Sequence, residues 1–466
     1  MVPERLKPTL RTANELARLF EAAGAHLYLV GGAVRDALAD RLAPGGDLDF
    51  TTDALPSRTE EILAPWADSI WAQGKRFGTI GAAKARQRIE VTTHRAERYG
   101  ASSRKPEVAF STALEADLSR RDFTVNAMAL SLPGLALVDP LNGVADLAAK
   151  RLRTPLAPEE SFADDPLRML RAARFIAAYE LDPEPELFAA VTRLRGRLDI
   201  ISDERVRDEL DKLIVAPDPS AGLWFLVRTG LAEEFLPELP ALALEQDPAH
   251  RHKDVLAHTI AVVARARPER TVRLAALFHD IGKPKTRSFG PGGTVSFHHH
   301  ELVGARMTRD RMKALRYPTG DIEKVSKLVE LHLRFHTYGM GWTDSAVRRY
   351  VRDVGDLLGP LNELTRSDST TRNLARAREL AARMDELERR VAELAEREEL
   401  AAIRPDMDGR DVMAHLGLAP GPLVGRALAY LLELRLEEGP HERGEATRLL
   451  DEWWASQPEA RRPGGT

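Results

Sequence analysis

The order of apolar and polar residues divides the chain into an N-terminal part that mixes strands with helices and a longer part that is helical. Short apolar runs predict strands at "HLYLVGG" (26–32), "GTIGAA" (78–83) and "RIEVTTH" (88–94), with helical stretches between them. From "DDPLRMLRAARFIAAYE" (164–180) onward, apolar residues recur at helical spacing almost to the end of the chain. The pattern predicts an α+β fold: a head with a small mixed sheet and packed helices, followed by an all-α remainder.

Changes in composition place the domain boundaries. We expect a catalytic head at 1–155, a helical neck at 156–242, a third, helical domain at 243–370 and a helical tail at 371–466. The third domain opens with the histidine-rich segment "ALEQDPAHRHKD" (243–254). Residues 371–403 contain no Gly or Pro, which predicts one long amphipathic helix with a solvated, charged face.

Composition narrows the class of protein. A chain of 466 residues is too long for one hydrophobic core, and 30% charged with 43% hydrophobic residues is typical of a soluble globular protein. No run approaches the roughly 18 apolar residues of a membrane span, and no signal peptide is evident, so we expect a cytoplasmic protein without a membrane partner. The absence of cysteine excludes disulfides, zinc–thiolate sites and thiol nucleophiles. The net charge of −4 requires any surface that binds a polyanion to be local.

The stretch "GGDLDF" (45–50) holds two carboxylates that would repel each other. If the residues around Leu48 and Phe50 form a strand, Asp47 and Asp49 point to the same face. A divalent cation with oxygen ligands is the usual reason for a protein to accept such a pair. The alternative is an ordinary turn, because "APGGD" is typical of loops.

A glycine pair precedes this stretch in "LYLVGGAVRDAL" (27–38). Gly31 and Gly32 allow the backbone to approach a ligand closely, and Arg35 in the following helical turn could meet a phosphate. Such a cradle next to a two-carboxylate metal site indicates nucleotidyl transfer. Glu90 is the candidate for a third catalytic acid, and its alternative is an exposed strand residue.

These stretches and the motifs after them resemble a known family. "GGAVRDAL" and "GGDLDFTT" are similar to the signature of the polymerase-beta superfamily, in its class II CCA-adding and poly(A) polymerase branch. The later motifs of that branch follow in order as "RRDFTVNAMA" (120–129), "DPLNGVADLAAKRLR" (139–153), "DDPLRMLRAARF" (164–175) and "ISDERVRDEL" (201–210). The resemblance implies a nucleotidyltransferase head followed by a neck that selects the nucleotide and binds RNA.

The resemblance also implies roles for particular residues. Asp47 and Asp49 would hold Mg²⁺, while Gly32, Arg35 and Arg121 would contact the nucleotide. Asp122 or Asn126 would meet the ribose, although both could instead form a structural network at a strand-to-helix turn. Further contacts near the nucleotide phosphates would come from Arg171 and Arg174.

Asp165 and Arg168 are the candidates for choosing the base. On a helix, residues three apart share one face, and this pair could accept from the exocyclic amine and donate to the ring acceptors of cytosine or adenine. Uracil and guanine would leave buried polar groups unpaired. The alternative is a surface salt bridge. The family usually has Glu directly before this Asp, whereas this chain has Asp164, which puts in doubt how that position braces the pocket.

Histidines and acids gather in a second set of motifs. They are "HKDVLAHT" (252–259), "ALFHDIGKPKT" (276–286), "FHHHELVGA" (297–305), "LVELHLRFH" (328–336) and "TRSDSTT" around Asp368. This order resembles the HD phosphohydrolase superfamily and suits a divalent transition metal or Mg²⁺. The resemblance implies metal ligands at His258, His279, Asp280 and Asp368, further ligands or phosphate contacts at His300 and His332, and a phosphate contact at Lys283. The alternative is a degenerate domain that only binds tRNA.

Together these motifs predict a CCA-adding tRNA nucleotidyltransferase. It would transfer CMP and AMP from CTP and ATP to the 3′ end of tRNA without a template, and its HD domain would hydrolyse phosphate esters. The segment "GKRFGTIG" (74–81) favours this reading over a poly(A) polymerase. A third hypothesis is an RNA-binding phosphohydrolase with an inactive head. The oligomeric state stays open at this stage.

Overall fold

The chain forms two compact units in the computed structural model. The first comprises Met1–Ala241 with Ala314–Tyr317, and the second comprises Leu242–Lys313 with Pro318–Thr466. Structure is described for residues 6–42, 46–98, 107–244, 254–291, 294–337, 342–369, 374–398 and 403–461. Most of the histidine-rich segment expected to open the third domain therefore lies outside the described residues.

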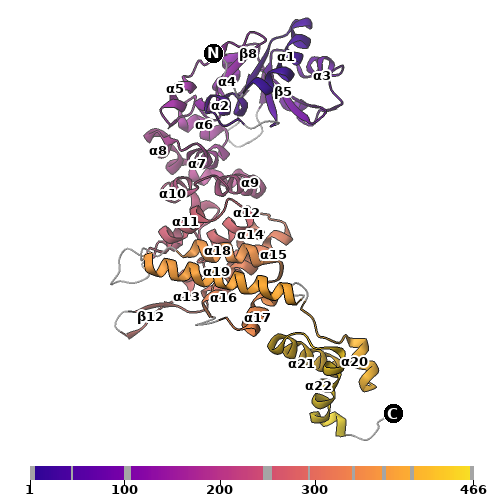
Figure 1. Cartoon of the computed structure of the whole chain (residues 1–466). Helices are drawn as coiled ribbons and strands as arrows, with labels where there is room; N and C mark the ends of the chain where they lie inside the picture. The colour runs from indigo at the N-terminus through magenta and orange to yellow at the C-terminus, as the bar shows by residue number, and fades with distance from the viewer. Residues whose placement is uncertain are drawn as a thin grey trace. The chain divides into compact units, whose positions relative to one another are not determined.

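The head contains the mixed sheet that the apolar pattern predicts (Figure 1). Its strands follow the order β3-β4-β5-β2-β1-β8-β9. Only β2 and β5 run parallel, and the other pairs in this sheet are antiparallel. The strands are β1 Leu27–Val30, β2 Leu48–Thr52, β3 Ser69–Trp71, β4 Thr79–Lys84, β5 Gln87–Thr93, β8 Ala129–Leu132 and β9 Leu137–Val138. A separate hairpin joins β6 Arg95–Arg98 to β7 Glu107–Phe110.

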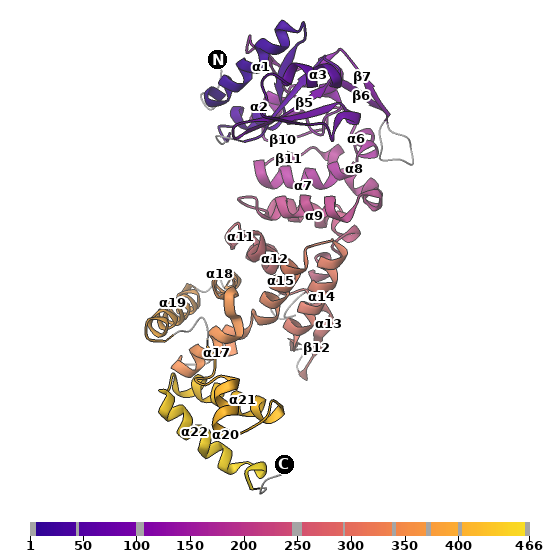
Figure 2. The same cartoon turned by 90° about the vertical axis from the view of Figure 1, so that its right-hand side faces the viewer.

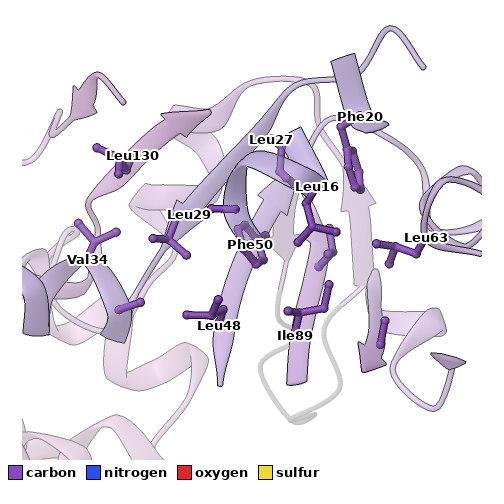
Figure 3. Close-up of a cluster of buried hydrophobic side chains, with 14 of the residues drawn as sticks. Leu16, Phe20, Leu27, Leu29, Val34, Leu48, Phe50, Leu63, Ile89 and Leu130 are labelled. Carbon is purple, nitrogen blue, oxygen red and sulfur yellow. The ribbon is translucent and has the colours of Figure 1, made fainter. Parts of the chain in front are cut away.

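Both faces of the central strand β1 are buried, which explains its continuous apolar sequence. Leu27 and Leu29 point into the larger core, where α1 Lys7–Ala22 and α3 Pro56–Leu63 cover the sheet (Figure 3). Val30 points to the opposite face and packs beside α4 Leu114–Ser119. This alternation of side chains fixes which face each residue of β1 and β2 presents.

The neck continues the first unit as a stack of helices around α7 Leu167–Tyr179. This helix packs against α9 Asp203–Ile214 and α10 Ser220–Arg228, and α6 Pro158–Asp164 packs on α8 Pro185–Leu194. The short helices α2 Gly32–Leu38 and α5 Gly143–Ala148 lie in the head. Two short strands, β10 Arg151–Leu152 and β11 Asp182–Pro183, pair in parallel between head and neck.

The second unit is built around α12 Arg270–Phe278, which packs against α11 Val255–Arg265, α15 Thr319–Leu331 and α18 Leu358–Asp368. The helices α13 Lys283–Thr286, α14 His300–Ala314, α16 Arg334–Thr337 and α17 Asp344–Val354 belong to the same body. A hairpin of β12 Arg287–Phe289 and β13 Val295–Phe297 interrupts the helices. The apolar pattern did not predict it, because strands of three residues are too short to show a period.

The predicted long helix is confirmed as α19 Leu374–Arg397. After it, α20 Gly409–Leu416, α21 Pro422–Glu438 and α22 Arg443–Ser456 share a small core of their own (Figure 2). Arg348 of α17 forms a buried ion pair with Glu398 and donates to backbone carbonyls at the end of α21. In the described part of the chain, no helix is long and apolar enough to cross a membrane.

Candidate active site and metal centre

One cavity of the first unit collects charged residues that are far apart in the sequence. It measures about 380 Å³ and lies where the strand ends of the head meet the neck. Seven of the residues that the motifs predict line it: Asp49, Glu90, Arg121, Asp122, Asp165, Arg168 and Arg171. Three arginines that the sequence reasoning did not single out line it too: Arg95, Arg120 and Arg205.

The carboxylates of this cavity come from neighbouring strands. Asp49 of β2 lies directly beside Glu90 of β5 in the parallel ladder, so their side chains leave the sheet on the same face. Asp47 immediately precedes β2 and, with Glu90, lines an adjoining cavity of about 330 Å³. The carboxylate oxygens of Asp47, Asp49 and Glu90 do not all lie within 4.8 Å of one another. Among the described residues, sets of potential metal ligands that are this close together occur in the second unit.

The charge around Asp49 suits a cation. Asp49 stays exposed to solvent, but partial removal of water by the surrounding protein raises the pKa of its carboxylate, and the negative charges of Glu90 and Asp47 act in the same direction. Arg121 opposes them, while its own guanidinium is held by the fully buried Asp117 at 3.2 Å. A divalent ion among these carboxylates would remove their mutual repulsion, and oxygen ligands are the kind that Mg²⁺ prefers.

The first residue of the predicted phosphate cradle needs to be glycine. Gly31 has φ of +68°, a conformation that residues with side chains rarely adopt. A Cβ atom at this position would also lie 3.3 Å from a guanidinium nitrogen of Arg121 and 3.7 Å from a carboxylate oxygen of Asp49. The backbone at Gly31 therefore borders the carboxylate site directly, and α2 begins at Gly32.

Arg35 is not among the residues that line the cavity. It is buried, and its guanidinium lies 4.2 Å from the ring centroid of Tyr179. Its nitrogens donate to Asn126, to the hydroxyl of Tyr179 and to Asp36. In this structure Arg35 joins α2 to the C-terminal end of α7, and its predicted phosphate contact stays a prediction.

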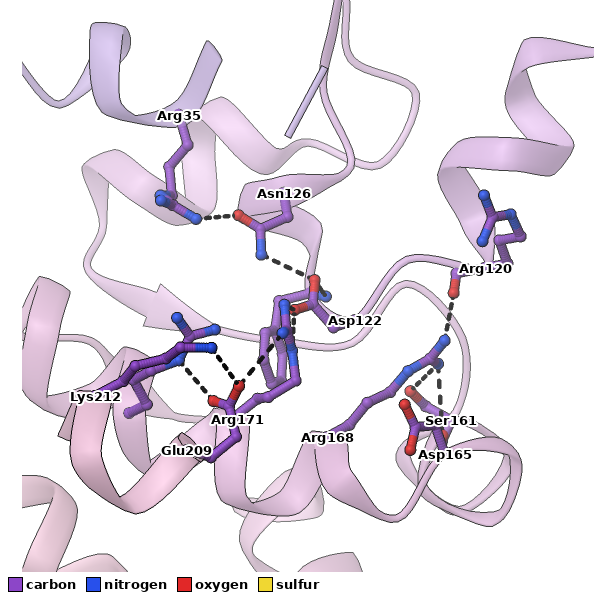
Figure 4. A network of polar contacts seen from close by, with 12 residues as sticks. Arg35, Arg120, Asp122, Asn126, Ser161, Asp165, Arg168, Arg171, Glu209 and Lys212 are labelled. Atoms are coloured by element: carbon purple, nitrogen blue, oxygen red, sulfur yellow. Dashed lines mark hydrogen bonds and ion pairs between the residues drawn. The ribbon is translucent and has the colours of Figure 1, made fainter. Parts of the chain in front are cut away.

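Asp122 forms the centre of a polar network that runs from the head into the neck (Figure 4). It accepts from Asn126 at 2.8 Å and from Nε of Arg171 at 2.9 Å. Burial acts to raise the pKa of Asp122, but the charge of Arg171 and these hydrogen bonds outweigh it and hold the pKa well below its usual range. The structure thus contains the network that we gave as the alternative to ribose binding, while Asp122 also borders the cavity.

The same network fixes the basic face of α7. The buried Glu209 of α9 pairs with Arg174 at 2.8 Å and with Arg171 at 3.7 Å. Arg174 is absent from the lining of the cavity, so the structure does not bring it together with the other predicted nucleotide contacts. Glu209 was missed as an individual residue, although its motif "ISDERVRDEL" was identified as supporting a helix.

The expectation that Asp165 and Arg168 lie on one helix is wrong. Pro166 caps the start of α7, and Asp165 before it has extended backbone angles. Asp165 accepts from the backbone N–H of Leu167 at 3.2 Å and is 3.4 Å from Arg205. Arg168 donates to Oγ of Ser161 at 2.8 Å. Both residues still line the same cavity, because the turn at Pro166 directs Asp165 towards it.

The second unit brings together all six predicted ligands of the HD motifs. His258 comes from α11, His279 and Asp280 follow α12, His300 starts α14, His332 follows α15, and Asp368 ends α18. Nε2 of His258 lies 2.9 Å from Asp368, and Nε2 of His279 lies 3.2 Å from Asp280. Nε2 of His300 is 3.4 Å from the other oxygen of Asp280. Asp280 therefore belongs to two candidate metal groups, one with His258 and His279 and one with His300 and His332.

Backbone hydrogen bonds prepare three of these histidines to bind a metal. Nδ1 of His279, His300 and His332 each faces a carbonyl oxygen three residues earlier, at 2.8, 2.8 and 2.7 Å. A carbonyl only accepts, so each Nδ1 carries a proton and each Nε2 is the nitrogen that a metal would bind. Burial lowers the pKa of His332 to about 3, which keeps that ring neutral, whereas the burial of His279 is outweighed by the negative charges of Asp280 and Asp368, which raise its pKa. These residues fit a divalent metal.

Close packing holds the centre together. A Cβ atom at Gly282 would lie 2.2 Å from the carbonyl oxygen of His300, so only glycine permits the turn after α12 to approach the start of α14. Lys283 follows that glycine and donates to Asp280 at 2.7 Å. The predicted phosphate contact thus lies directly at the metal ligands, on the first turn of α13.

Comparison with known proteins agrees with both sites. Family models match "Poly A polymerase head domain" at residues 27–153, "Probable RNA and SrmB- binding site of polymerase A" at 180–242 and "HD domain" at 255–401. Head domains of this kind and HD domains generally use divalent metals. The chain thus carries a head domain, an RNA-binding segment and an HD domain of the kinds that these models describe.

Full-length relatives define the family more closely. The chain is 38% identical to an A-adding tRNA nucleotidyltransferase of Deinococcus radiodurans, over 92% of this chain and 96% of that protein. It is 33% identical to a CC-adding tRNA nucleotidyltransferase of Thermus thermophilus, over 91% and 93% respectively. The chain belongs to the tRNA nucleotidyltransferase family. A crystal structure of the Bacillus stearothermophilus CCA-adding enzyme with CTP has the same fold, with a TM-score of 0.68, 23% identity and coverage of 97% and 98%.

Proposed function

We propose that the head adds CMP and AMP from CTP and ATP to the 3′ end of tRNA, and that it does so in the cytoplasm. The observation that carries this proposal is the single cavity in which Asp49 and Glu90 face a group of arginines. Acidic residues at one side suit metal-bound phosphates, and guanidinium groups at the other suit the remaining phosphate oxygens. The full-length relatives act on tRNA by name, which favours tRNA over other RNA.

In this proposal Asp47, Asp49 and Glu90 hold Mg²⁺. Mg²⁺ bound there would activate the tRNA 3′-hydroxyl and neutralise the charge that develops at the α-phosphate. Arg121, which Asp117 fixes, and Arg171, which Asp122 fixes, orient the triphosphate for in-line attack with pyrophosphate as the leaving group. Arg120 and Arg205 enlarge the basic wall of the cavity.

Asp165 and Arg168 select the base. The carboxylate of Asp165 accepts from the exocyclic amine of cytosine or adenine, and Arg168 donates to the ring acceptors. Arg205 lies 3.4 Å from Asp165, and both residues line the cavity. Uracil and guanine would leave this pair unsatisfied, so the site needs no nucleic-acid template.

Incorporation of single nucleotides tests the proposal. The substrates are one tRNA ending at its discriminator base and a second ending in CC, each incubated with one labelled NTP and Mg²⁺. We expect CTP to extend the first, ATP to complete the second, and UTP and GTP to label neither. Equal labelling by UTP or GTP would contradict the role of Asp165 and Arg168, and long A tracts on unrelated RNA would indicate a poly(A) polymerase.

The same assay distinguishes full CCA addition from addition of the terminal A alone. The similarity to an A-adding enzyme over nearly the whole chain favours the second possibility as an alternative. In that case ATP would extend the tRNA ending in CC, whereas CTP would leave the tRNA ending at its discriminator base unchanged.

We further propose that the HD centre is a metal-dependent phosphohydrolase acting on 2′,3′-cyclic or terminal phosphates of RNA. The observation that favours this activity is the convergence of three Nε2 atoms on Asp280, beside Lys283. A degenerate domain has no need to keep such tautomers fixed. Metal analysis and hydrolysis of a terminally phosphorylated oligonucleotide test it with His279→Ala. We expect that variant to lose metal and at least a hundredfold in rate, because loss of an outer-shell partner alone costs about 10–100-fold and His279 would be a direct ligand.

A further inference from the structure

The β12–β13 hairpin beside the HD centre carries an aromatic side chain that the protein itself does not cover. Phe289 is 68% exposed, the highest value among the large hydrophobic residues that the structure describes as exposed. It stands two residues along the strand from Arg287, whose guanidinium lies 4.8 Å from the centroid of its ring. An exposed ring with a cation on one face is a typical platform for a nucleobase.

The register of the hairpin puts these groups on one face. Arg287 pairs with Phe297, and Phe289 pairs with Val295, so these four side chains lie on the same side of the two strands. Ser288 and Ser296 pair on the opposite side, where their hydroxyls are 2.7 Å apart. The face that holds Phe289 is therefore aromatic and basic, and the other face is small and polar.

The aromatic face leads into the metal centre. Nζ of Lys283 lies 5.6 Å from the ring centroid of Phe297 and 2.7 Å from Asp280. The carbonyl of Phe297 fixes the ring of His300. Rings and cations thus alternate from Phe289 through Arg287 and Phe297 to Lys283, which meets the candidate metal ligands. Each strand step is roughly 3.3 Å, so Phe289 lies about 7 Å further along β12 than Arg287.

We propose that this face of the hairpin binds the last unpaired nucleotides of an RNA 3′ end, with a base stacked on Phe289 and the terminal phosphate at the HD centre. The occupant is single-stranded RNA, because its bases offer a flat apolar face and its phosphates complement Lys283 and Arg287. A duplex end would keep its bases stacked within the helix and leave Phe289 without a partner. The proposal rests on the proposed phosphohydrolase and specifies its substrate class.

Binding of a short RNA tests it on the full-length, metal-loaded protein. The probe is a fluorescein-labelled single-stranded pentanucleotide that ends in a 3′-phosphate, followed by anisotropy. We expect Phe289→Ala to weaken binding roughly tenfold, within the range that loss of one stacked base produces. Phe289→Trp restores the affinity, because indole offers a larger face for stacking. The matched control is Ser288→Ala on the opposite face of the same strand, which binds as the unaltered protein does.

Kinetics give a second readout. Phe289→Ala lowers kcat/KM for the oligonucleotide relative to kcat/KM for a small aryl phosphate, since only the oligonucleotide has a base to stack. Equal oligonucleotide affinity for Phe289→Ala and the unaltered protein would overturn the proposal, as would a self-association that Phe289→Ala abolishes while RNA binding persists. Failure of the unaltered protein to release any phosphate would instead contradict the proposed phosphohydrolase, and the binding comparison would still decide on Phe289.

Discussion

At the scale of single residues, the head places carboxylates side by side, and their repulsion is unfavourable unless a ligand neutralises it. Asp49 lies beside Glu90 in the ladder, and Arg121 and Arg171 are held in place by Asp117 and Asp122. The arginines keep fixed orientations because their carboxylate partners are buried. Asp49 has no such partner at hydrogen-bonding distance among the described residues, so its charge is available to an ion.

The raised pKa of Asp49 leads to a prediction about stability. A carboxyl group whose pKa is higher in the folded state binds its proton more tightly after folding. The ionised form therefore lowers the free energy of unfolding at neutral pH, and this cost disappears as the pH falls through the folded-state pKa. In EDTA at pH 7 we expect Asp49→Asn to melt at a higher temperature than the unaltered protein, with the difference shrinking towards pH 4.

The same Asp49→Asn variant should be less active, although it melts at a higher temperature. Asp49→Asn removes a charged metal ligand, so we expect nucleotide incorporation to fall by at least about a thousandfold, of the order that one strong electrostatic contribution to a transition state supplies. Glu61→Gln, an exposed residue of α3, is the control for loss of one negative charge. A melting temperature that falls in Asp49→Asn would contradict the electrostatic account of this site.

The sequence motifs predicted seven of the residues that line the cavity, but they did not show which motif residues would face it. The carboxylates were singled out because their spacing by two matches the period of a strand. Arg120 and Arg205 lie in recognised motifs and Arg95 does not, but none of the three was singled out, since the direction of a single arginine depends on tertiary packing. The arrangement of Asp165 was wrong because the helical pattern of α7 continues visibly through "DDPLRML", whereas Pro166 shifts the start of the helix.

At the scale of elements, the contact between α2 and α7 connects the phosphate cradle of the head to the helix that carries Arg168 and Arg171. Arg35 reaches across it to Tyr179, and Asn126 links it to Asp122. A glycine turn and a short helix have little stability of their own. The guanidinium of Arg35 therefore adds polar contacts to the apolar packing of Ala33, Val34 and Ala37 that holds the phosphate cradle in place.

Replacing this arginine should separate a structural role from a nucleotide contact. Lysine carries its three donors on a single nitrogen and lacks the planar fork that reaches Asn126, Tyr179 and Asp36 from separate nitrogens, so we expect Arg35→Lys to lower the free energy of unfolding by about 1.5–3 kcal/mol, the range for hydrogen bonds to a charged group. Urea unfolding measures this loss, and Arg41→Lys, on an exposed arginine near the same tyrosine, should change little. A normal free energy of unfolding with a raised KM for NTP would instead identify Arg35 as a phosphate contact.

At the scale of the whole molecule, two sets of candidate metal ligands occupy two separate units. The head carboxylates belong to the first unit, and the histidines belong to the second. The four-domain division that the sequence predicts stays a prediction. One of its boundaries, near residue 242, coincides with the boundary between the two units of the structure. Nothing in either site requires a residue of the other.

The two chemistries should therefore be separable by single substitutions. We expect Asp49→Asn to abolish nucleotide incorporation while hydrolysis of the phosphorylated oligonucleotide keeps its rate. His279→Ala should do the reverse, because its effect is confined to the second unit. Parallel assays of both activities on each variant measure this independence, and a loss of both activities in either variant would contradict it.

The parallel rung between β2 and β5 has a consequence for how this protein can evolve. The loops between the elements that connect the two strands, α3, β3 and β4, can gain or lose residues more readily than β2 and β5 themselves, since the rung is set by hydrogen bonding across the sheet and not by loop length. A single deletion inside β5 ahead of Glu90 has a larger effect, because it shifts the register of the strand by one residue and so reverses the face of each side chain. It would turn that carboxylate into the hydrophobic interior and bring an aliphatic neighbour out to the acidic site. One mutation would thus abolish catalysis and disrupt the core.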